Sequence, residues 1–384
     1  MKLPISIIFR KKNYRSKAFL AAFNCIHHQL KYSSYLTKSV FVSESNDIFA
    51  NLALEDWFYQ HYDFTQHQVL LLWRNRNCVV VGRHQNPWLE TNLNSNDDLI
   101  VARRNSGGGT VYHDMDNLNL TFFTPRDLYD RRHNLEIITN SVKKEWSLDC
   151  EVNSRDDIVY EEFKISGTAS KLSRKSAYHH CTLLVDANKK RMSAALHNFQ
   201  KNIITNATRS TPAPILNLRE LNPSITIERL MTVVGLQYMR TIPSINTKQI
   251  ESVKAKGFRF VSPEERYFPG LDEKIENFQS WQWRFGRTPK FTVKASSSMS
   301  EIFAKSVSSE QTEIDIDVEA GIVKNISVNV PPSFIPFVTN DELKNVTMSY
   351  VERQYSDDLL SIVKEHVFQL FRNKVNDQRL SNVL

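Results

Sequence analysis

Glycine is scarce in this chain: only 10 of its 384 residues are glycine, against an average share of about 7 % in proteins. No apolar stretch reaches the ~20 residues that a membrane-spanning helix needs. The four cysteines, at positions 25, 78, 150 and 181, are scattered and show neither disulfide-framework nor zinc-ligand spacing. We therefore predict no membrane span, no disulfide-stapled module and no zinc motif.

Acidic residues are absent from residues 1–43, where eight of the 49 basic residues lie. The rest of the chain holds the other 41 basic residues against 42 acidic ones, so it is close to neutral although the whole chain carries +7. A neutral body argues against a nucleic-acid-binding surface, which needs a basic face. We predict no nucleic-acid partner.

The basic, acid-free leader is typical of a mitochondrial transit peptide. A secretory signal is the alternative, because residues 18–23 form a short apolar run behind a basic patch. Basic residues continue after that run, at Lys31 and Lys38, and no clear small-residue cleavage site follows it. The leader therefore favours the mitochondrion, and we predict a transit peptide over residues 1–40.

The remaining chain divides near residues 263–270, where prolines and a glycine interrupt the pattern. We predict a catalytic domain over 41–262, then a linker and a small C-terminal domain over 263–384. Strand-like runs cluster with helices between them and seldom alternate strictly, which predicts an α+β fold. A hairpin is expected at 69–82, and another around residues 161–162. Helices are expected near 47–62, 133–146, 190–198, 226–239, 272–280 and 357–371.

Three of the ten glycines stand together in segment 103–114, which reads Arg-Arg-Asn-Ser-Gly-Gly-Gly-Thr-Val-Tyr-His-Asp between strand-like runs. Glycine permits positive φ and close approach of the backbone, and successive N–H groups can form an anion-binding concavity. Arginine suits bidentate phosphate recognition. Neither a Walker loop nor a dinucleotide fingerprint is present. The segment predicts a strand–loop–strand phosphate cradle; a plain surface loop is the alternative.

Lys164 lies in a second motif, residues 163–171, which reads Phe-Lys-Ile-Ser-Gly-Thr-Ala-Ser-Lys. Its ammonium group is a compact charge with three donors and suits a phosphate; a solvent-facing strand lysine is the alternative. His179 and His180 suggest a metal, but neighbours on a strand point to opposite faces. We predict no metal site.

These motifs resemble those of the lipoate–protein ligase and lipoyltransferase family. The resemblance rests on the glycine segment with Asn-x-Asn-x-Thr-Phe-Phe at 117–123, on Gly-Arg-x-Gln-Asn-Pro-Trp at 82–88, on Arg-x-Asp-Ile at 155–158 and on His-His-x-Thr-Leu-Leu at 179–184. Details at 110–115, 167–171, 180–182 and 281–291 resemble the mitochondrial lipoyltransferases within that family.

The resemblance implies the biotin/lipoyl protein ligase fold with a small α+β C-terminal domain. It implies transfer of a lipoyl group from lipoyl-AMP, or from lipoylated glycine cleavage H protein, to a lysine of the lipoyl domains of 2-oxoacid dehydrogenase complexes in the mitochondrial matrix. No tightly bound cofactor is implied; Mg²⁺ and ATP are needed only if the enzyme also activates lipoate. A two-step ligase and a non-catalytic lipoyl-domain binder are the alternatives.

The resemblance also implies residue roles. Lys164 would be the catalytic residue, bridging the phosphate and the acyl oxygen as the acceptor amine attacks. Arg103 and Arg104 are both candidates for the leaving pyrophosphate of an activation step. Implied lipoyl-AMP contacts are Arg104, Ser106, Gly107, Gly108, Gly109, Thr110, Val111, Tyr112, Arg155, Lys164, Thr182 and Thr208. Supporting residues are His84, His113, Asp114, Asn119, Asp157, Gly167 and Ala169.

Overall fold

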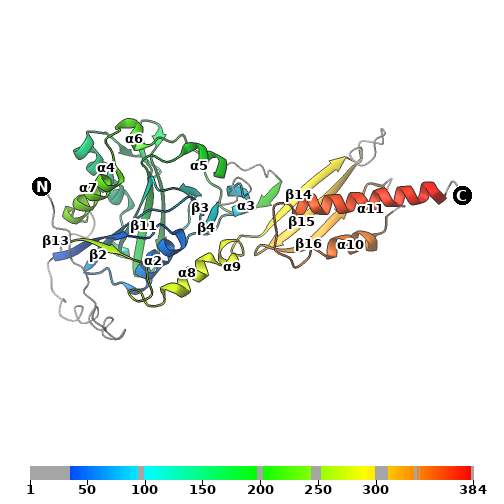
Figure 1. The fold of residues 1–384 in the computed structure, drawn as a ribbon, viewed down its shortest axis with the longest axis horizontal. Coiled ribbons are helices and arrows are strands. Elements are labelled where there is room, and N and C mark those ends of the chain that lie inside the picture. The colour runs from blue at the N-terminus through cyan, green and yellow to red at the C-terminus, as the bar shows by residue number, and fades with distance from the viewer. Residues whose placement is uncertain are drawn as a thin grey trace.

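The computed structural model describes residues 35–93, 99–196, 202–243, 252–298, 310–332, 335–336 and 338–381, without the side chains of 375–381. Most of the predicted leader, residues 1–34, lies outside the described residues. The helices and strands form a mixed α+β arrangement in two parts, with the second part extending away from the first (Figure 1). The predicted α+β class is confirmed.

A six-stranded sheet forms the centre of the first part, in the order β10-β11-β6-β2-β1-β13. β1 pairs in parallel with both β2 and β13, whereas the pairs β2–β6, β6–β11 and β11–β10 are antiparallel. The strands are β1 (Tyr35–Ser43), β2 (His67–Trp73), β6 (Asn117–Pro125), β10 (Ser166–Leu172), β11 (Ser176–Leu184) and β13 (Ser252–Val261).

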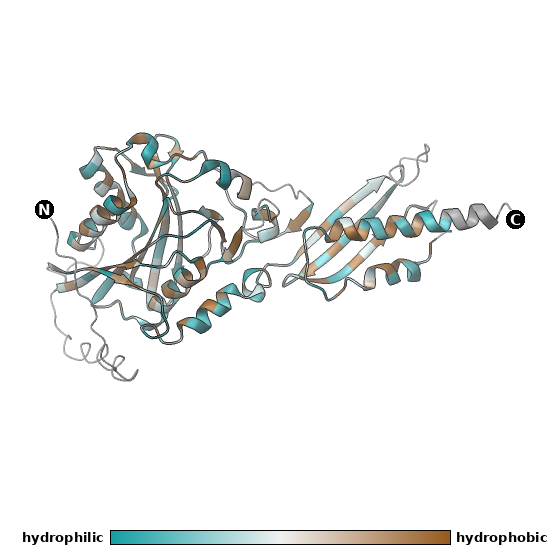
Figure 2. Cartoon of the chain, in the orientation of Figure 1, coloured by the Kyte–Doolittle hydropathy of each residue, from teal (hydrophilic) through white to brown (hydrophobic). Residues whose placement is uncertain are grey.

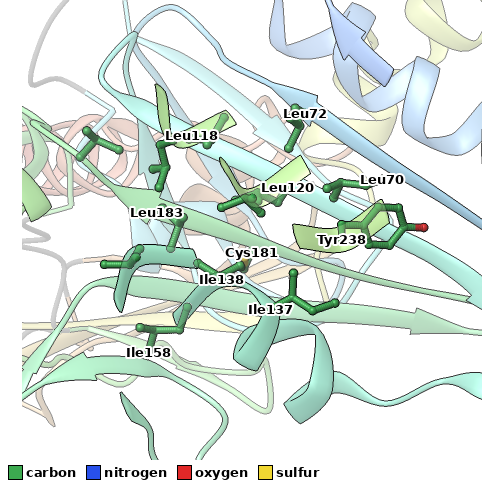
Figure 3. Packing of buried hydrophobic residues seen from close by; sticks show 14 of the residues in the cluster. Leu70, Leu72, Leu118, Leu120, Ile137, Ile138, Ile158, Cys181, Leu183 and Tyr238 are labelled. Carbon is green, nitrogen blue, oxygen red and sulfur yellow. The ribbon is translucent and has the colours of Figure 1, made fainter. Parts of the chain in front are cut away.

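Both faces of this sheet are covered. Helices α4 (Arg131–Trp146) and α7 (Ile227–Arg240) pack on one face through a core that includes Leu70, Leu120 and Cys181 (Figure 3). Helix α2 (Ile48–His61) packs on the other face through a second core. Because β2 is buried on both faces, its sequence is continuously apolar from Val69 to Trp73 instead of alternating.

A three-stranded sheet lies against the α2 side, with β3 (Cys78–Val81) between β4 (Ile100–Arg103) and β5 (Val111–His113). The predicted hairpin at 69–82 is wrong, because β2 and β3 belong to different sheets. Asn75, in the connection, is fully buried and hydrogen-bonds Asn51 and His113. The connection is therefore a buried crossing between sheets and not an exposed turn.

A small three-stranded sheet of β7 (Glu151–Val152), β8 (Ile158–Tyr160) and β9 (Phe163–Lys164) carries the second predicted hairpin, which is confirmed. Residues 161 and 162 form its turn, and Glu161 adopts a left-handed φ of 54°.

The second part is a four-stranded antiparallel sheet covered on one face by helices α10 (Asn340–Met348) and α11 (Leu359–Ser381). Its strands, in spatial order, are β12 (Ile203–Thr205), β14 (Phe291–Ser298), β15 (Gln311–Glu319) and β16 (Ile322–Asn329). Hydropathy alternates along β14 and β15, as expected for a sheet with one buried face (Figure 2). β12 comes from a segment that precedes α7, so the chain crosses between the two parts more than once.

The remaining helices are short. They are η1 (Arg126–Leu128), α3 (Pro87–Glu90), α5 (Lys189–Leu196), α6 (Leu218–Leu221), α8 (Leu271–Gln279) and α9 (Trp281–Arg284). Within the described residues, none of the helices is both long and apolar enough to cross a membrane.

Arg103, the last residue of β4, joins the first part to the chain that leads into the second. Its fully buried guanidinium group donates to three carbonyl oxygens of segment 82–85, to the carbonyls of residues 283 and 284, and to the Thr288 hydroxyl, at 2.8–3.2 Å. In return, the Trp283 indole N–H donates to the Arg103 carbonyl at 2.8 Å. Burial lowers the pKa of Arg103 to about 10, so the group keeps its charge at neutral pH.

We expect Arg103→Met to destabilise the protein by more than about 3 kcal/mol, because several buried carbonyl oxygens lose their donor at ~1–3 kcal/mol each. The measurement is the thermal midpoint by differential scanning fluorimetry. Arg126→Met is the matched control, because Arg126 is exposed, and surface changes usually stay within about 0.5 kcal/mol. Equal shifts for the two variants would contradict the role assigned to Arg103.

Candidate functional site

A small cavity of about 30 Å³ lies between the six-stranded sheet and the three-stranded sheet of β4, β3 and β5. Its walls are apolar on the α2 and β3 sides and polar where β5, β6 and β11 meet. Seven of the predicted site residues line it: Arg104, Val111, His113, Asn119, Gly167, Ala169 and Thr182. Leu52, Trp73, Val80, Thr168, His180 and Cys181 complete the lining.

The glycine loop, residues 104–110, connects β4 to β5, and both strands pair with β3. This is the predicted strand–loop–strand arrangement. Gly108 has a φ of +84°, in the region that favours glycine. A methyl group added at Gly82 would lie 2.2 Å from the Gly108 carbonyl oxygen. Glycine at 82 therefore lets the loop pack directly against the end of β3.

Arg104 stabilises the glycine loop through hydrogen bonds to its backbone carbonyls. Its Nη2 donates to the carbonyls of Gly107 and Gly109, both at 2.6 Å, and its Nη1 donates to the Val80 carbonyl at 2.9 Å. Its Nε donates to Ser106 Oγ at 3.0 Å. The side chain is buried, which lowers its pKa to about 10. In this geometry Arg104 shapes the loop, and a direct contact with phosphate stays a prediction.

Arg103 is not available for a phosphate, because its donors already meet six protein acceptors. The expectation that it serves a leaving pyrophosphate is wrong. The reason is the strand geometry: successive side chains point to opposite faces, so Arg104 reaches the loop and Arg103 reaches away from it.

The segment of residues 207–216 lies across the glycine loop. Ser210 Oγ accepts a hydrogen bond from the Thr110 backbone N–H at 2.8 Å, and its hydroxyl donates to the Glu90 carboxylate. The Thr208 N–H donates to the His84 carbonyl at 3.1 Å. The side chains of Thr208 and His84 are both exposed. Through these bonds the segment contacts both His84 and Thr110, which come from two other parts of the chain.

The same segment also reaches Lys164. The Lys164 N–H donates to the Pro214 carbonyl at 2.9 Å, and the Leu216 N–H donates to the Lys164 carbonyl at 3.1 Å. The ammonium group forms an ion pair with Asp157 at 2.8 Å. The Lys164 side chain is 25 % exposed and that of Asp157 11 %, so a ligand can approach the charge from the solvent side.

Twelve of the predicted site residues do not line the cavity, among them Tyr112, Asp114 and Arg155. Tyr112 is buried in a core cluster with Val79, Val81 and Met192. This cluster lies between α5 and the sheet of β4, β3 and β5. Asp114 accepts the Asn188 N–H at 2.9 Å and fixes the start of α5. Arg155 is exposed in the turn between β7 and β8. Their roles toward a ligand remain predictions.

Glu55, which the sequence analysis did not single out, belongs to the site through His180. The His180 imidazole lies 2.8 Å from Ser106 Oγ through Nε2 and 2.8 Å from Glu55 Oε1 through Nδ1. Arg104 Nε donates to Ser106, so the Ser106 hydroxyl hydrogen is free to bond Nε2, and Nδ1–H donates to the carboxylate. The available signal was a glutamate within the otherwise largely apolar helix segment 48–58.

This Ser–His–Glu arrangement has the bonding order of a nucleophilic triad. Ser106 is only 1 % exposed, however, and its oxygen is enclosed between the Arg104 guanidinium and the His180 ring. An acyl carbonyl therefore has no approach to that oxygen. Ser106, His180 and Glu55 therefore stabilise the glycine loop, and Ser106 does not act as a nucleophile.

His179 and His180 face opposite sides of β11, as predicted. The His179 ring stacks on Phe122 at a centroid distance of 6.0 Å and an angle of 14°, while His180 lines the cavity. Across the part of the chain that the structure describes, no group of three or more His, Cys, Asp or Glu side chains is placed to hold a metal ion.

Acidification should destabilise the fold through His113. Burial, together with the nearby positive charge of Arg104, lowers the pKa of His113 from 6.5 to about 3, so the ring is neutral in the fold. Between pH 6.5 and 3 the unfolded state binds more protons than the folded state. The free energy of unfolding should therefore fall with decreasing pH, by up to ~1.4 kcal/mol per unit from this group.

The measurement is the thermal midpoint from pH 7.5 to 4.5 for the wild type and for His113→Gln. Glutamine cannot titrate, so the variant should lose part of the pH dependence. Contributions that the two proteins share cancel in the comparison. Identical slopes for the two proteins would count against a neutral His113.

The family model described as the lipoyl protein ligase A/B catalytic domain matches residues 47–238. The chain is 39 % identical over 312 residues to the mitochondrial lipoyl amidotransferase of Mus musculus, covering 79 % of each chain. The corresponding protein of Homo sapiens is 38 % identical, again with 79 % of each chain covered.

Solved structures agree on the fold. P. falciparum LipL1 in complex with lipoate superposes with a TM-score of 0.54 at 24 % identity, covering 85 % of this chain and 93 % of that one. A putative lipoate protein ligase from T. acidophilum with bound lipoic acid gives 0.52 at 19 % identity, covering 65 % and 99 %. The predicted ligase fold is confirmed.

Proposed function

Because the chain belongs to the lipoyl protein ligase A/B family, we propose that it transfers a lipoyl group from an activated donor to a lysine of a lipoyl domain. One observation carries the proposal: segment 207–216 joins the glycine loop to Lys164, with Ser210 at the Thr110 amide and Pro214 at the Lys164 amide. A glycine loop suited to phosphate and a partly exposed ammonium group are therefore held together by one short segment. An acyl adenylate presents the matching pair, an anionic phosphate beside an electrophilic carbonyl.

In the proposed reaction the acceptor amine attacks the acyl carbonyl, a carbon–nitrogen bond forms, and the bond from the carbonyl carbon to the phosphate oxygen breaks. AMP leaves, and one proton is released from the amine. Negative charge develops on the acyl oxygen and on the leaving phosphate. Lys164 stabilises that charge, once its ion pair with Asp157 exchanges for the ligand. The Asp157 carboxylate keeps the ammonium group in position before the substrate binds.

Lipoyl-AMP and lipoylated glycine cleavage H protein are both proposed as donors, and lipoyl domains of 2-oxoacid dehydrogenase complexes as acceptors. The mitochondrial names of the two mammalian relatives support a mitochondrial location, with the matrix as the proposed compartment. β1 begins at Tyr35 and pairs on both sides. A leader removed on import would therefore need to end before Tyr35, since a cut at residue 40 would take six residues from this strand.

We expect Lys164→Ala to lower kcat/KM for transfer from lipoyl-AMP to an apo lipoyl domain by ~10²–10³-fold, because it removes a positioned charge from a developing anion. Lys171→Ala is the matched control. Lys171 is also a strand lysine, 26 % exposed and paired with an aspartate, Asp56, at 3.4 Å. The control should stay within a few-fold of wild type. Near-normal transfer by the Lys164 variant would refute the catalytic role.

A complete two-step ligase is the second candidate, and the engagement of Arg103 weighs against it. Activation of lipoate needs cations for the leaving pyrophosphate, and Arg103 is committed to protein acceptors. We expect pyrophosphate release from lipoate, ATP and Mg²⁺ to be much slower than transfer from synthetic lipoyl-AMP. Comparable rates would assign a complete ligase and overturn the preference for transfer alone.

A further inference from the structure

Two chains of buried hydrogen bonds reach the cavity, and they end differently. In the first, Ser106 donates to His180, and His180 and Thr121 donate to the Glu55 carboxylate, with Trp73 Nε1 donating to Thr121. The donors in this chain are all used in hydrogen bonds that end at the Glu55 carboxylate, which can only accept. This chain therefore leaves no donor for a ligand.

The second chain starts at Ser43, the last residue of β1. Ser43 Oγ donates to Asn51 Oδ1 at 2.6 Å, and Asn51 Nδ2 donates to the carbonyls of Ser45 and Arg74, both at 3.0 Å. Carbonyl oxygens only accept, so these contacts fix which end of the Asn51 amide is the donor. The same Nδ2 donates to Asn75 Oδ1 at 2.9 Å, which fixes the Asn75 amide in turn.

The direction then passes through His113 into the cavity. Asn75 Nδ2 donates to His113 Nδ1 at 2.8 Å, so the neutral ring carries its proton on Nε2. His113 Nε2 donates to Thr182 Oγ1 at 3.1 Å, and the Thr182 hydroxyl donates to Asn119 Oδ1 at 2.7 Å. Because the Thr182 hydroxyl donates to Asn119 Oδ1, the other end of the Asn119 side-chain amide is the NH₂ group.

Asn119 Nδ2 is the open end of this chain. The residue lines the cavity and is 1 % exposed, and Nδ2 has no hydrogen-bond partner among the described residues. A buried donor without a partner costs free energy. Asn119 lies opposite Thr182 in the sheet, and Thr182 lies opposite Gly167, three residues along from Lys164. The free donor therefore lies two strands from Gly167, in the same sheet.

We propose that Asn119 Nδ2 donates a hydrogen bond to an acceptor atom of the bound acyl group, and so forms part of the acyl-recognition site. This inference rests on the proposed function. A lipoyl group offers two kinds of acceptor, its carbonyl oxygen and its ring sulfurs, with a hydrocarbon chain between them that offers none. Thr182, predicted to contact the same ligand, acts in this geometry by orienting the Asn119 amide.

The test measures binding without turnover, by calorimetric titration of the full chain with lipoyl- and octanoyl-sulfamoyl adenosine, stable analogues of the acyl adenylates. Both carry the acyl carbonyl, and only the first carries ring sulfurs. Asn119→Leu removes the donor at similar volume, and Asn119→Ala is the second variant if leucine prevents folding. Gln68→Leu is the matched control, because Gln68 is another buried carboxamide, on β2, bonded to Thr124 outside the cavity.

We expect the Asn119 variants to weaken binding about five- to tenfold, the usual scale of one neutral hydrogen bond. Weaker binding of both analogues assigns the carbonyl oxygen, and weaker binding of the lipoyl analogue alone assigns the ring sulfurs. Wild-type affinity of the variants for both analogues, or an equal loss in Gln68→Leu, overturns the inference. A wild type that binds the analogues but transfers no lipoyl group would refute the proposed function and leave this inference standing.

Discussion

Two adjacent guanidinium groups, buried and bonded chiefly to backbone carbonyl oxygens, determine how the site is built. Arg103 ends β4, Arg104 follows it directly, and the two side chains point to opposite sides. Arg104 donates hydrogen bonds to carbonyls of the glycine loop, and Arg103 donates to those of segment 82–85 and of residues 283–284. Among the residues that the structure describes, neither guanidinium group donates a hydrogen bond to a carboxylate. Burial of a charge is tolerated only when its donors are satisfied, so these loops must hold their conformation for the arginines to remain inside.

Segment 207–216 extends this dependence to the second part of the molecule. It begins just after β12, which pairs with β14 of the four-stranded sheet, and ends beside Lys164. Trp88 of α3 packs in the core of that second part, against Phe291 and Tyr355, while Glu90 of the same helix accepts from Ser210. The second part therefore contacts the glycine loop in two ways, through segment 207–216 and through helix α3. Both contacts stabilise the segment that lies over the proposed adenylate site.

Much of this arrangement was predictable from local sequence. The glycine cluster, its flanking strands, the hairpin around Glu161 and the opposite facing of the two histidines follow from turn chemistry and the two-residue period of strands. β13 was missed because it is an exposed edge strand, with Lys254, Lys256 and Arg259 where alternation would show. β12 has only three residues, and its partner lies about 90 positions later.

The errors at the site have a common cause. Arg103 was read as a phosphate ligand because residue type alone cannot say which face of a strand meets the ligand. Glu55 was missed because its partner, His180, is 125 residues away in the sequence. Asn75 sits in a stretch that reads as a polar turn, yet it is fully buried as a link between two sheets. In each case a long-range contact decided the role of a polar side chain, and local patterns do not carry that information.

The placement of Cys181 has a chemical consequence for a protein that handles a cyclic disulfide. A dithiolane ring is open to attack by a thiolate, which would trap the substrate as a mixed disulfide. The alternation of β11 turns the Cys181 side chain into the core beneath α4, beside Leu120 and Ile138 (Figure 3). Its neighbours His180 and Thr182 point to the opposite face, although Cys181 also borders the cavity. Burial raises the pKa of the Cys181 and Cys78 thiols well above their usual range. Both thiols therefore stay protonated, and the site can hold a strained disulfide without exchanging with it.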